Sequence, residues 1–273
     1  FFMTEAGVAE ELPTEPIGYL KVVTLGESTL SAEELTSIAG NLANGAVIDL
    51  GEATFATTEF PMDFARKTNL QEIALPRNIQ TFASEAYSGA FYNCTNLKRV
   101  TLPEGLTAIG ANCFRQCSQL ESIELPSSVR TLDIYAFYGC KSLTSVVIPE
   151  GVEAIPRFIF DSCTALTDVT LPSTLKSIGT EAFEATGLKE ITIPESVTSV
   201  EAAVFKNCKS LERIQFPDAL TAIPANLCNA CSALTTINMP SKLETVGNDA
   251  FYNCGKLQDV TFPETLKSLD ERS

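Results

Sequence analysis

The sequence predicts a solenoid of the α/β class, in which each coil adds one short strand and one short helix or turn. A repeat of nearly constant length, fixed apolar columns and the lack of an internal linker lead to this prediction. About nine repeats of 22–27 residues follow from the spacing of one proline column: Pro76, Pro103, Pro126, Pro149, Pro172, Pro194, Pro217, Pro240 and Pro263. A fixed period in this range is typical of stacked supersecondary units.

The residues before each proline predict the strand. Leucine stands six positions before every proline, and isoleucine or valine stands three positions before it, as Leu97, Val100 and Pro103 illustrate. The position next to the proline is also apolar, so two apolar side chains share one face of an extended segment. Proline has no N–H for the ladder, and we therefore expect the strand to end there.

The residues after each proline predict the rest of the coil. A second apolar pair comes first, as at Leu106 and Ile109, followed by a small residue and an aromatic one, as at Ala136 and Phe137. Cysteine follows the aromatic residue after three positions, as Cys140 does. This spacing predicts a short helix or helical turn that presents phenylalanine and cysteine on one face.

The segment "LTAIGANCFRQCSQLESIELP", residues 106–126, resembles the BspA-like leucine-rich repeats of bacterial surface proteins. The resemblance covers residues 60–269. It implies a right-handed leucine-rich repeat solenoid with a parallel sheet on the inner face. It also implies a secreted or cell-surface protein of an anaerobic bacterium, whose relatives act as adhesins on host matrix proteins or other cells.

We expect residues 1–59 to be an acidic tail and N-terminal capping segment and residues 60–273 to be the solenoid. "LKVVTL" (20–25) and "AVIDL" (46–50) predict strands, and "SAEELTSIAGNLA" from Ser31 predicts a helix with a serine N-cap. The capping segment would close the open end of the core.

At the other end, the strand predicted over 257–262 would leave a sheet edge. It could pair with another chain, giving end-to-end self-association, or with a continuation of this one. A strictly monomeric species at high concentration, measured by light scattering, would contradict self-association.

Tyrosines mark two further features of the repeat. The 27-residue interval contains an insertion, "ASEAYSGAF", which places Tyr87 on a surface loop that is either a binding element or an idle turn. Tyr92, Tyr138 and Tyr252 share a column after the phenylalanine. Their role is either to anchor a partner or to pack between neighbouring turns.

Charge and composition exclude several classes of function. The 19 Lys and Arg residues against 34 Asp and Glu residues give a net charge of −15, which repels nucleic acid and anionic lipid. Histidine is absent, which removes the Ser-His and Cys-His dyads. The apolar runs are too short for a transmembrane helix. With no catalytic motif, phosphate loop or metal-ligand set, we expect no enzyme activity, catalytic residue, cofactor or metal.

Seven of the nine cysteines share one column, and the other two also take inward positions. Side chains of equivalent residues on adjacent coils point in parallel, a poor geometry for disulfides. We expect buried, reduced cysteines, with disulfides or a metal site as the alternatives.

We expect partner binding through polar residues that alternate with the apolar columns of the strand. The candidates are Arg99, Thr101, Glu124, Asp168, Thr170, Glu190, Thr192, Arg213, Gln215, Asn238 and Thr261. Two functions remain open: an adhesin-like module that binds a protein or another cell-surface ligand, and a structural spacer that holds another domain away from the cell surface.

Overall fold

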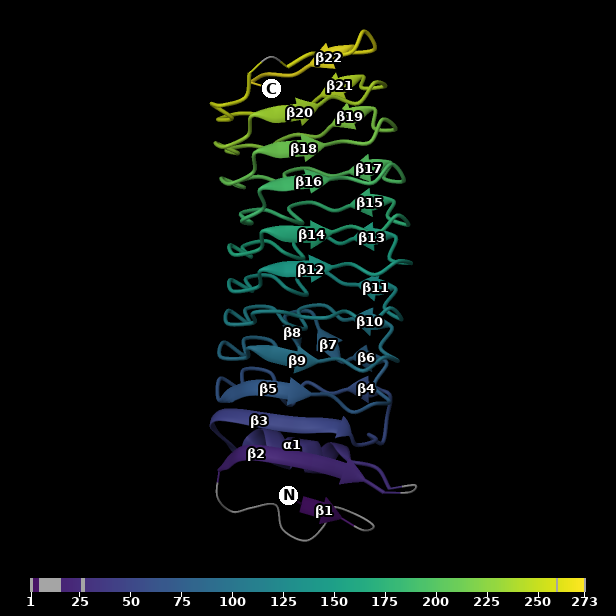
Figure 1. Ribbon diagram of the computed structural model, residues 1–273, viewed down its shortest axis with the longest axis vertical. Helices are drawn as coiled ribbons and strands as arrows, with labels where there is room; N and C mark the ends of the chain where they lie inside the picture. The colour runs from purple at the N-terminus through teal and green to yellow at the C-terminus, as the bar shows by residue number, and fades with distance from the viewer. Residues whose placement is uncertain (1, 5–15, 26–27, 259, 273) are drawn as a thin grey trace. The chain divides into compact units, whose positions relative to one another are not determined.

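A computed structural model describes residues 2–4, 16–25, 28–258 and 260–272 of the chain. The protein divides into two compact units, an N-terminal unit, Phe1–Leu143, and a C-terminal unit, Thr144–Ser273. In each unit short parallel strands lie one above another along successive coils (Figure 1).

The N-terminal unit has one five-stranded parallel sheet. Its strands, in spatial order, are β1 (Phe2–Thr4), β2 (Ile17–Thr24), β3 (Leu42–Glu52), β5 (Leu70–Ala74) and β9 (Arg99–Thr101). A second set of short parallel pairs consists of β4 (Glu59–Phe60) with β6 (Thr81–Phe82) and β10 (Ala108–Ile109) with β11 (Thr131–Leu132). The strands predicted over 20–25 and 46–50 are therefore present, with wider bounds.

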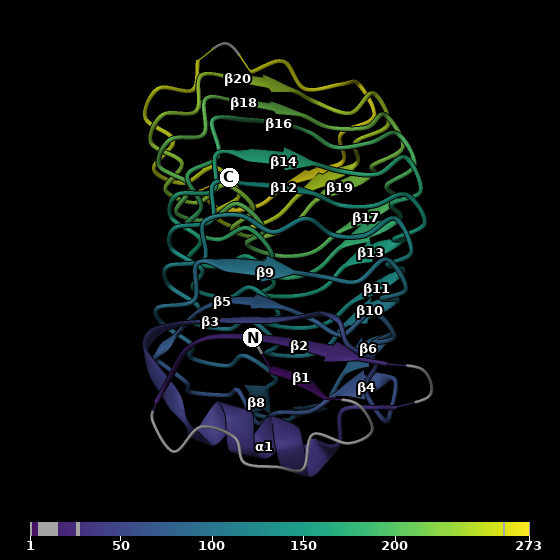
Figure 2. The same cartoon turned by 60° about the horizontal axis from the view of Figure 1, so that its bottom comes forward.

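The helix predicted after Ser31 is α1, Ala32–Gly40. A capping box begins it: Ser31 Oγ accepts a hydrogen bond from Glu34 N at 3.2 Å, and Ser31 N donates to Glu34 Oε2 at 2.7 Å. Leu35 and Ile38 are fully buried. α1 completes the first coil across from β2 and β3 (Figure 2). β3 pairs with β5, the first strand of the repeats. We therefore propose that residues 1–59 cap the repeats at this end.

The C-terminal unit contains two kinds of short parallel strand in each coil. The first kind forms the sheets β12 (Ser145–Val147) with β14 (Asp168–Thr170), and β16 (Glu190–Thr192) with β18 (Arg213–Gln215) and β20 (Thr236–Asn238). The second kind forms the sheets β13 (Ala154–Ile155), β15 (Ser177–Ile178) and β17 (Ser199–Val200), and β19 (Ala222–Ile223), β21 (Thr245–Val246) and β22 (Ser268–Leu269). The second residue of each such apolar pair, for example Ile155 or Ile178, therefore lies in a short strand that the sequence did not predict.

Of the two alternatives expected outside the strands, short helices or turns, the structure has turns. Apart from α1, the described residues contain no α-helix, and the segments with phenylalanine and cysteine are turns. Asn112 and Gln116 adopt left-handed backbone angles, with φ of 56° and 63°, and the following repeats have such residues at equivalent positions. A left-handed residue every fourth position interrupts helical hydrogen bonding.

The backbone amides of these turns alternate between two kinds of partner. Cys117 N donates within its own coil to Phe114 O at 3.0 Å, whereas Phe114 N donates to Ala136 O of the next coil at 2.8 Å. The turn segments therefore join neighbouring coils through the backbone, as the strands do, and this satisfies amides that a helix would use internally.

Stacked phenylalanines fill the core beneath the turns. In the N-terminal unit, Phe114 stacks on Phe91 and on Phe137 with ring centroids 5.4 Å apart in both pairs. In the C-terminal unit, Phe183 lies 5.6 Å from Phe160 and 5.8 Å from Phe205. Each ring thus buries its faces against the coils on either side, so a coil depends on its neighbours for its core.

The strand expected over 257–262 is absent from the described part of this segment, which leaves out residue 259. The last strand of the C-terminal unit is β22, which pairs with β21 on one side. Pairing of this end with another chain stays a prediction.

Candidate functional site

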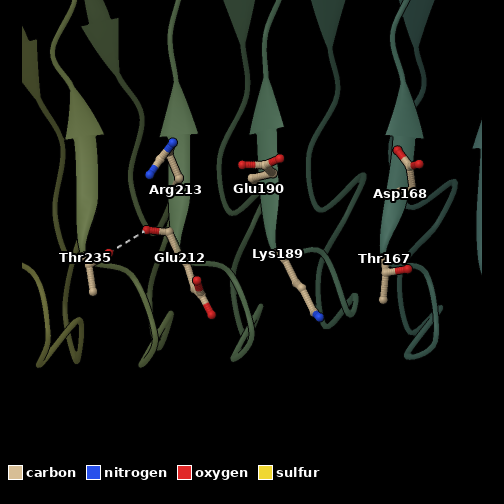
Figure 3. Close-up of a pocket in the computed structure, with 7 residues that line it drawn as sticks. All are labelled: Thr167, Asp168, Lys189, Glu190, Glu212, Arg213 and Thr235. Carbon is tan, nitrogen blue, oxygen red and sulfur yellow. Dashed lines mark hydrogen bonds between the residues drawn. The ribbon is translucent and has the colours of Figure 1, made fainter.

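The C-terminal unit carries a shallow groove of about 490 Å³ across the strands β14, β16, β18 and β20. Its lining consists of residues at or just before the start of each strand: Thr167, Asp168, Lys189, Glu190, Glu212, Arg213 and Thr235. Figure 3 shows these side chains standing out from successive strands. The repeat therefore brings residues that are one period apart in sequence into one row.

The groove is lined by charges of both signs. Glu190 and Arg213 are paired in the register of β16 and β18, and both are exposed. Among the residues that the structure describes, Arg213 forms no ion pair. Thr235 Oγ1 donates to the Glu212 carbonyl at 3.1 Å, which fixes one wall of the groove. An exposed guanidinium without a carboxylate partner can form a bidentate contact with a carboxylate from outside the chain.

The N-terminal unit has a similar hollow of about 480 Å³, lined in part by Arg99, Thr101 and Glu124. Here Arg99 Nη2 lies 2.6 Å from Glu72 Oε1, across the β5–β9 pair. This ion pair raises the pKa of Arg99 and occupies its guanidinium. Arg99 is therefore less available to a partner than Arg213.

All eleven candidate residues are exposed. Nine lie on strands, whereas Glu124 and Thr261 lie outside any strand. Asn238 already uses its amide group, because its Oδ1 accepts from Phe216 N at 2.8 Å and its Nδ2 donates to Phe216 O at 3.0 Å. Asn238 thus substitutes for ladder hydrogen bonds at the end of β18, a structural role that the repeat pattern alone does not reveal.

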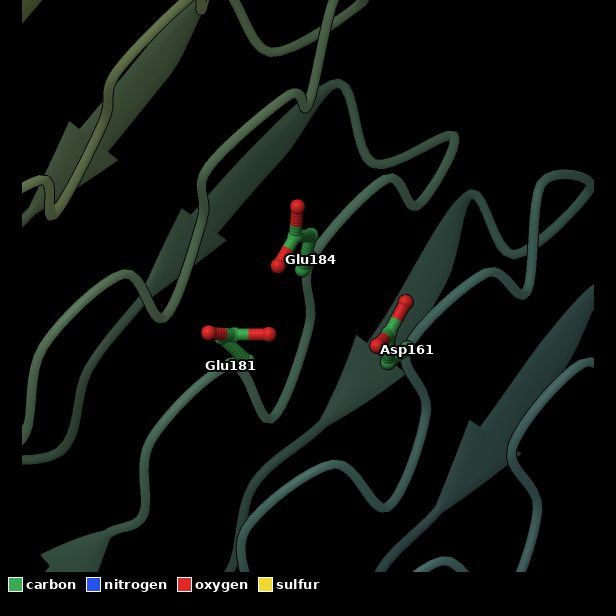
Figure 4. Close-up of side chains that lie close together, drawn as sticks. All are labelled: Asp161, Glu181 and Glu184. Carbon is green, nitrogen blue, oxygen red and sulfur yellow. The ribbon is translucent and has the colours of Figure 1, made fainter.

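Three carboxylates on the turns of the C-terminal unit lie close together. Oxygen atoms of Asp161, Glu181 and Glu184 are all within 4.8 Å of one another. The three side chains come from two neighbouring coils (Figure 4). Lys206 Nζ lies 3.2 Å from Glu184 Oε1, and Asn207 Nδ2 donates to the same oxygen at 3.0 Å. Part of the negative charge is therefore compensated from the chain itself.

A retained proton compensates more of that charge. Burial, followed by the hydrogen bond with Glu184, raises the pKa of Glu181 to about 7. Burial also raises the pKa of Asp161, against the hydrogen bond that Ser162 Oγ donates to its Oδ1 at 2.8 Å. We assign no metal to this cluster.

We expect this cluster to make stability depend on pH. The folded pKa of Glu181 lies above its ordinary value of 4.5, so its stabilising contribution is complete below about pH 4.5 and is lost as the pH rises through about 7. Urea unfolding at pH 5 and pH 8 should show a loss on the order of 1–2 kcal/mol from this group, since the side chain is partly exposed. Glu181→Gln should remove this contribution to the fall in the free energy of unfolding between pH 5 and pH 8.

Glu201→Gln is the control for this measurement, because hydrogen bonds from Thr180 lower the pKa of Glu201 instead. Its contribution varies only at more acidic pH. An equal effect of both substitutions between pH 5 and pH 8 would contradict a specific role of Glu181.

The nine cysteines are all free and buried. Members of the repeat column make a contact that composition does not indicate, in which the thiol donates to a backbone carbonyl of the preceding coil. The contact is made by Cys94, Cys117, Cys140, Cys208, Cys231 and Cys254. Cys117 Sγ lies 3.1 Å from Phe91 O, and Cys231 Sγ lies 3.0 Å from Phe205 O. The prediction of buried, reduced cysteines is confirmed, and the column also supplies a hydrogen bond between coils.

The sequence pattern of the BspA type leucine-rich repeat region, in six copies, matches residues 62–164, 85–212 and 153–273. The chain belongs to the BspA-type leucine-rich repeat family. The matches together span the whole repeated part of the sequence. The fold is accordingly a parallel-strand β-solenoid of about 11 turns with little helix.

Solved structures of bacterial leucine-rich repeat proteins are similar to this chain. A leucine rich cell surface protein from Faecalibacterium prausnitzii A2-165 is 22% identical, with 85% of each chain covered and a TM-score of 0.55. A leucine-rich repeat protein from Bacteroides ovatus ATCC 8483 is 19% identical over 82% of each chain, with a TM-score of 0.41. The first similarity supports the fold. No curated protein matches the chain.

The BspA-type family is generally non-enzymatic. In the described part of the chain, no helix has the length and apolar character needed to cross a membrane. Leucine-rich repeat domains generally bind proteins, and membership in this family is consistent with a protein-binding module.

The cluster of Asp161, Glu181 and Glu184 was not predicted from the sequence. A signal was present, because Asp161 and Glu184 occupy the same column of consecutive repeats, two positions before the cysteine position. The same column holds Tyr92, Arg115 and Tyr138 in the N-terminal unit. This column therefore indicates both the acidic cluster of the C-terminal unit and the aromatic and basic residues of the N-terminal unit.

Proposed function

We propose that this protein is a non-enzymatic, adhesin-like protein-binding module displayed at a bacterial cell surface. The observation that carries the proposal is the groove of the C-terminal unit, in which the exposed Arg213 lies between Glu190 and Thr236 and has no ion-pair partner among the described residues. A row of exposed residues on a rigid sheet presents binding groups in a fixed geometry. The charges give such a surface specificity for a partner with the complementary pattern.

The cell-surface location is supported by the family and by the structural neighbour from F. prausnitzii, described as a leucine rich cell surface protein. In each unit the exposed candidates offer a polar surface rather than an apolar core. Such an interface depends on many small contacts, so we expect a moderate affinity that falls with salt.

Binding should depend on Arg213. We expect Arg213→Gln to weaken binding to a protein partner at least tenfold, because a charge-assisted contact contributes about 1.5–3 kcal/mol. The measurement is a screen of the purified chain against immobilised host matrix proteins, cell-surface glycans and bacterial surface components at two salt concentrations. Any saturable interaction is then titrated with the variant.

Lys209→Gln is the matched control, since it removes the same charge from an exposed residue of the turns in the same unit. It should leave the affinity within about twofold. Equal losses in both variants would indicate a general effect of net charge and would contradict a site at the groove.

A structural spacer is the alternative function, favoured by one observation. The outward residues of the strands are small or charged and almost free of aromatic side chains, which usually dominate tight interfaces. A spacer predicts no saturable partner in the screen from a chain that is folded by circular dichroism, and full tolerance of Arg213→Gln.

A further inference from the structure

The turn segments of the N-terminal unit carry a group of aromatic and basic side chains, here called the tyrosine–arginine patch. Its members are Arg66, Tyr87, Tyr92, Arg115, Tyr135 and Tyr138. Tyr92, Arg115 and Tyr138 occupy one column of three consecutive repeats. The period therefore places these three side chains side by side. They lie on the turn segments and not on the strands that carry the predicted binding residues.

Arg115 lies at the centre of the patch. Its Cζ is 4.8 Å from the ring centroid of Tyr135, 5.2 Å from that of Tyr138 and 5.9 Å from that of Tyr92. Tyr135 and Tyr138 meet edge to face at 5.7 Å. Arg66 Cζ lies 5.6 Å from the Tyr92 ring. These cation–π contacts hold the exposed Arg66 and the half-buried Tyr92, Arg115, Tyr135 and Tyr138 in place, so a partner would meet a preorganised surface.

The insertion of the 27-residue interval is joined to this patch. It forms the antiparallel pair β7 (Ser84–Glu85) and β8 (Ser88–Gly89), with Tyr87 between the two strands and 82% exposed. Asn112, which is fully buried, donates through Nδ2 to the carbonyls of Glu85 at 3.3 Å and Ala86 at 3.5 Å. Its Oδ1 accepts from Arg115 Nη1 at 3.1 Å. One buried amide thus links the exposed loop to the central arginine.

The two guanidinium groups are not neutralised within the chain. Among the described residues, neither Arg66 nor Arg115 forms an ion pair, and Arg115 Nε is buried without a hydrogen-bond partner. Arg272 provides a contrast: it also lies over a tyrosine, Tyr252, at 5.0 Å, but its Nε is 2.9 Å from Asp249 Oδ1. Among the arginines that form no ion pair with a described residue, Arg66 and Arg115 are set apart by lying over tyrosine rings.

We propose that the tyrosine–arginine patch binds a protein segment in which a carboxylate side chain lies next to an aromatic or other apolar one. The inference rests on the proposed protein-binding function and assigns a second face to it. The guanidinium groups match the carboxylate, and the tyrosine rings cover the apolar neighbour. Because the whole chain is acidic, the partner carries only a few carboxylates at this point and is not strongly acidic overall.

A random peptide display library tests this proposal with the full chain as bait. The wild-type protein should enrich peptides with Asp or Glu next to an aromatic or apolar residue. The protein with Tyr87→Ala should enrich them at least tenfold less, and Arg115→Gln should behave in the same way. Tyr87 is so exposed that its replacement leaves the core intact. Tyr19→Ala is the matched control, because Tyr19 is a 61% exposed tyrosine of β2 outside the patch.

A synthetic peptide of the enriched sequence then gives the affinity directly. Replacing its carboxylate by the amide should raise the Kd at least tenfold for the wild-type protein and much less for Arg115→Gln. Enrichment of peptides without carboxylates, equal enrichment by all variants, no enrichment by any, or selective binding of glycans on an array would overturn the proposal.

The same selection separates this inference from the groove. Arg213→Gln should enrich the same peptides as the wild-type protein, since Arg213 lies on β18. A matrix-protein interaction lost in Arg213→Gln but kept in Tyr87→Ala and Arg115→Gln would retain the proposed function and reject the patch.

Discussion

Replacing Phe114 by alanine should destabilise the protein by about 3–5 kcal/mol, the largest effect that we expect from one substitution in the repeats. Phe114 is fully buried and stacked on both faces, at 5.4 Å and interplanar angles of 4° and 8°. A third ring, Phe82, meets Phe114 edge to face with the ring centroids 5.9 Å apart. Alanine would leave a cavity between two coils, and neither can close it without losing its own backbone ladder. Urea unfolding followed by circular dichroism measures the loss.

Two further variants make this result specific. Phe114→Leu keeps most of the volume and should cost less than about 1.5 kcal/mol. Phe251→Ala removes the same atoms from the same column where the ring is only half-buried and the preceding coil has Cys228 in place of phenylalanine, so it should cost clearly less than Phe114→Ala. A cost below about 1 kcal/mol for Phe114→Ala would contradict the interdependence of the coils.

The strands could be predicted from the sequence because their columns obey two simple rules. Alternating apolar residues select an extended segment with one buried face, and proline ends it. Leu97, Val100 and Leu102 illustrate this, since all three are buried while Arg99 and Thr101 between them are exposed. The residues of β2 and β3 follow the same alternation, and the N-cap at Ser31 specifies where α1 begins.

The sequence predicted a short helix or a turn after each second apolar pair, but the spacing did not decide between a helix and a series of tight turns. Phenylalanine and cysteine three positions apart fit either structure. The decision depends on left-handed residues such as Asn93 and Asn112, and on backbone hydrogen bonds to the next coil, which no single repeat contains. The second strand of each coil was missed for the same reason. Ile109, the second residue of its apolar pair, lies in β10, whose partner β11 is one coil away.

The candidate site was predicted only in part. Outward exposure follows from alternation, and all eleven residues are exposed. The availability of each guanidinium does not follow from alternation, because it depends on the neighbour one period away. Glu72 pairs with Arg99, whereas no described residue forms an ion pair with Arg213. The tyrosine–arginine patch likewise depends on residues one repeat apart. In a repeat protein, side chains that interact at a site come from equivalent positions of adjacent coils rather than from neighbouring positions in the sequence.

Native thiol labelling should find almost no reactive cysteine, whereas the denatured chain should show nine free thiols. Burial raises the pKa of Cys94 and Cys208 from 9.0 to about 12, and it raises the pKa of Cys117 as well. Since the thiolate is the reacting species, a rise of this size lowers its fraction roughly a thousandfold, before any loss of access. The measurement is absorbance during labelling with an aromatic disulfide reagent, with and without denaturant.

The order of labelling adds a sharper test of the fold. Cys254 is 8% exposed, whereas Cys117 is fully buried, so Cys254 should react first and its replacement by alanine should remove the earliest phase. Cys117→Ala should leave that phase unchanged while lowering stability by about 1 kcal/mol, because Phe91 O loses the thiol as a hydrogen-bond donor. Fewer than nine thiols in the denatured, unreduced chain would show disulfides and contradict the parallel column. Rapid native labelling of several thiols would mean that the coils open one at a time, without the cooperative core that the stacked rings imply.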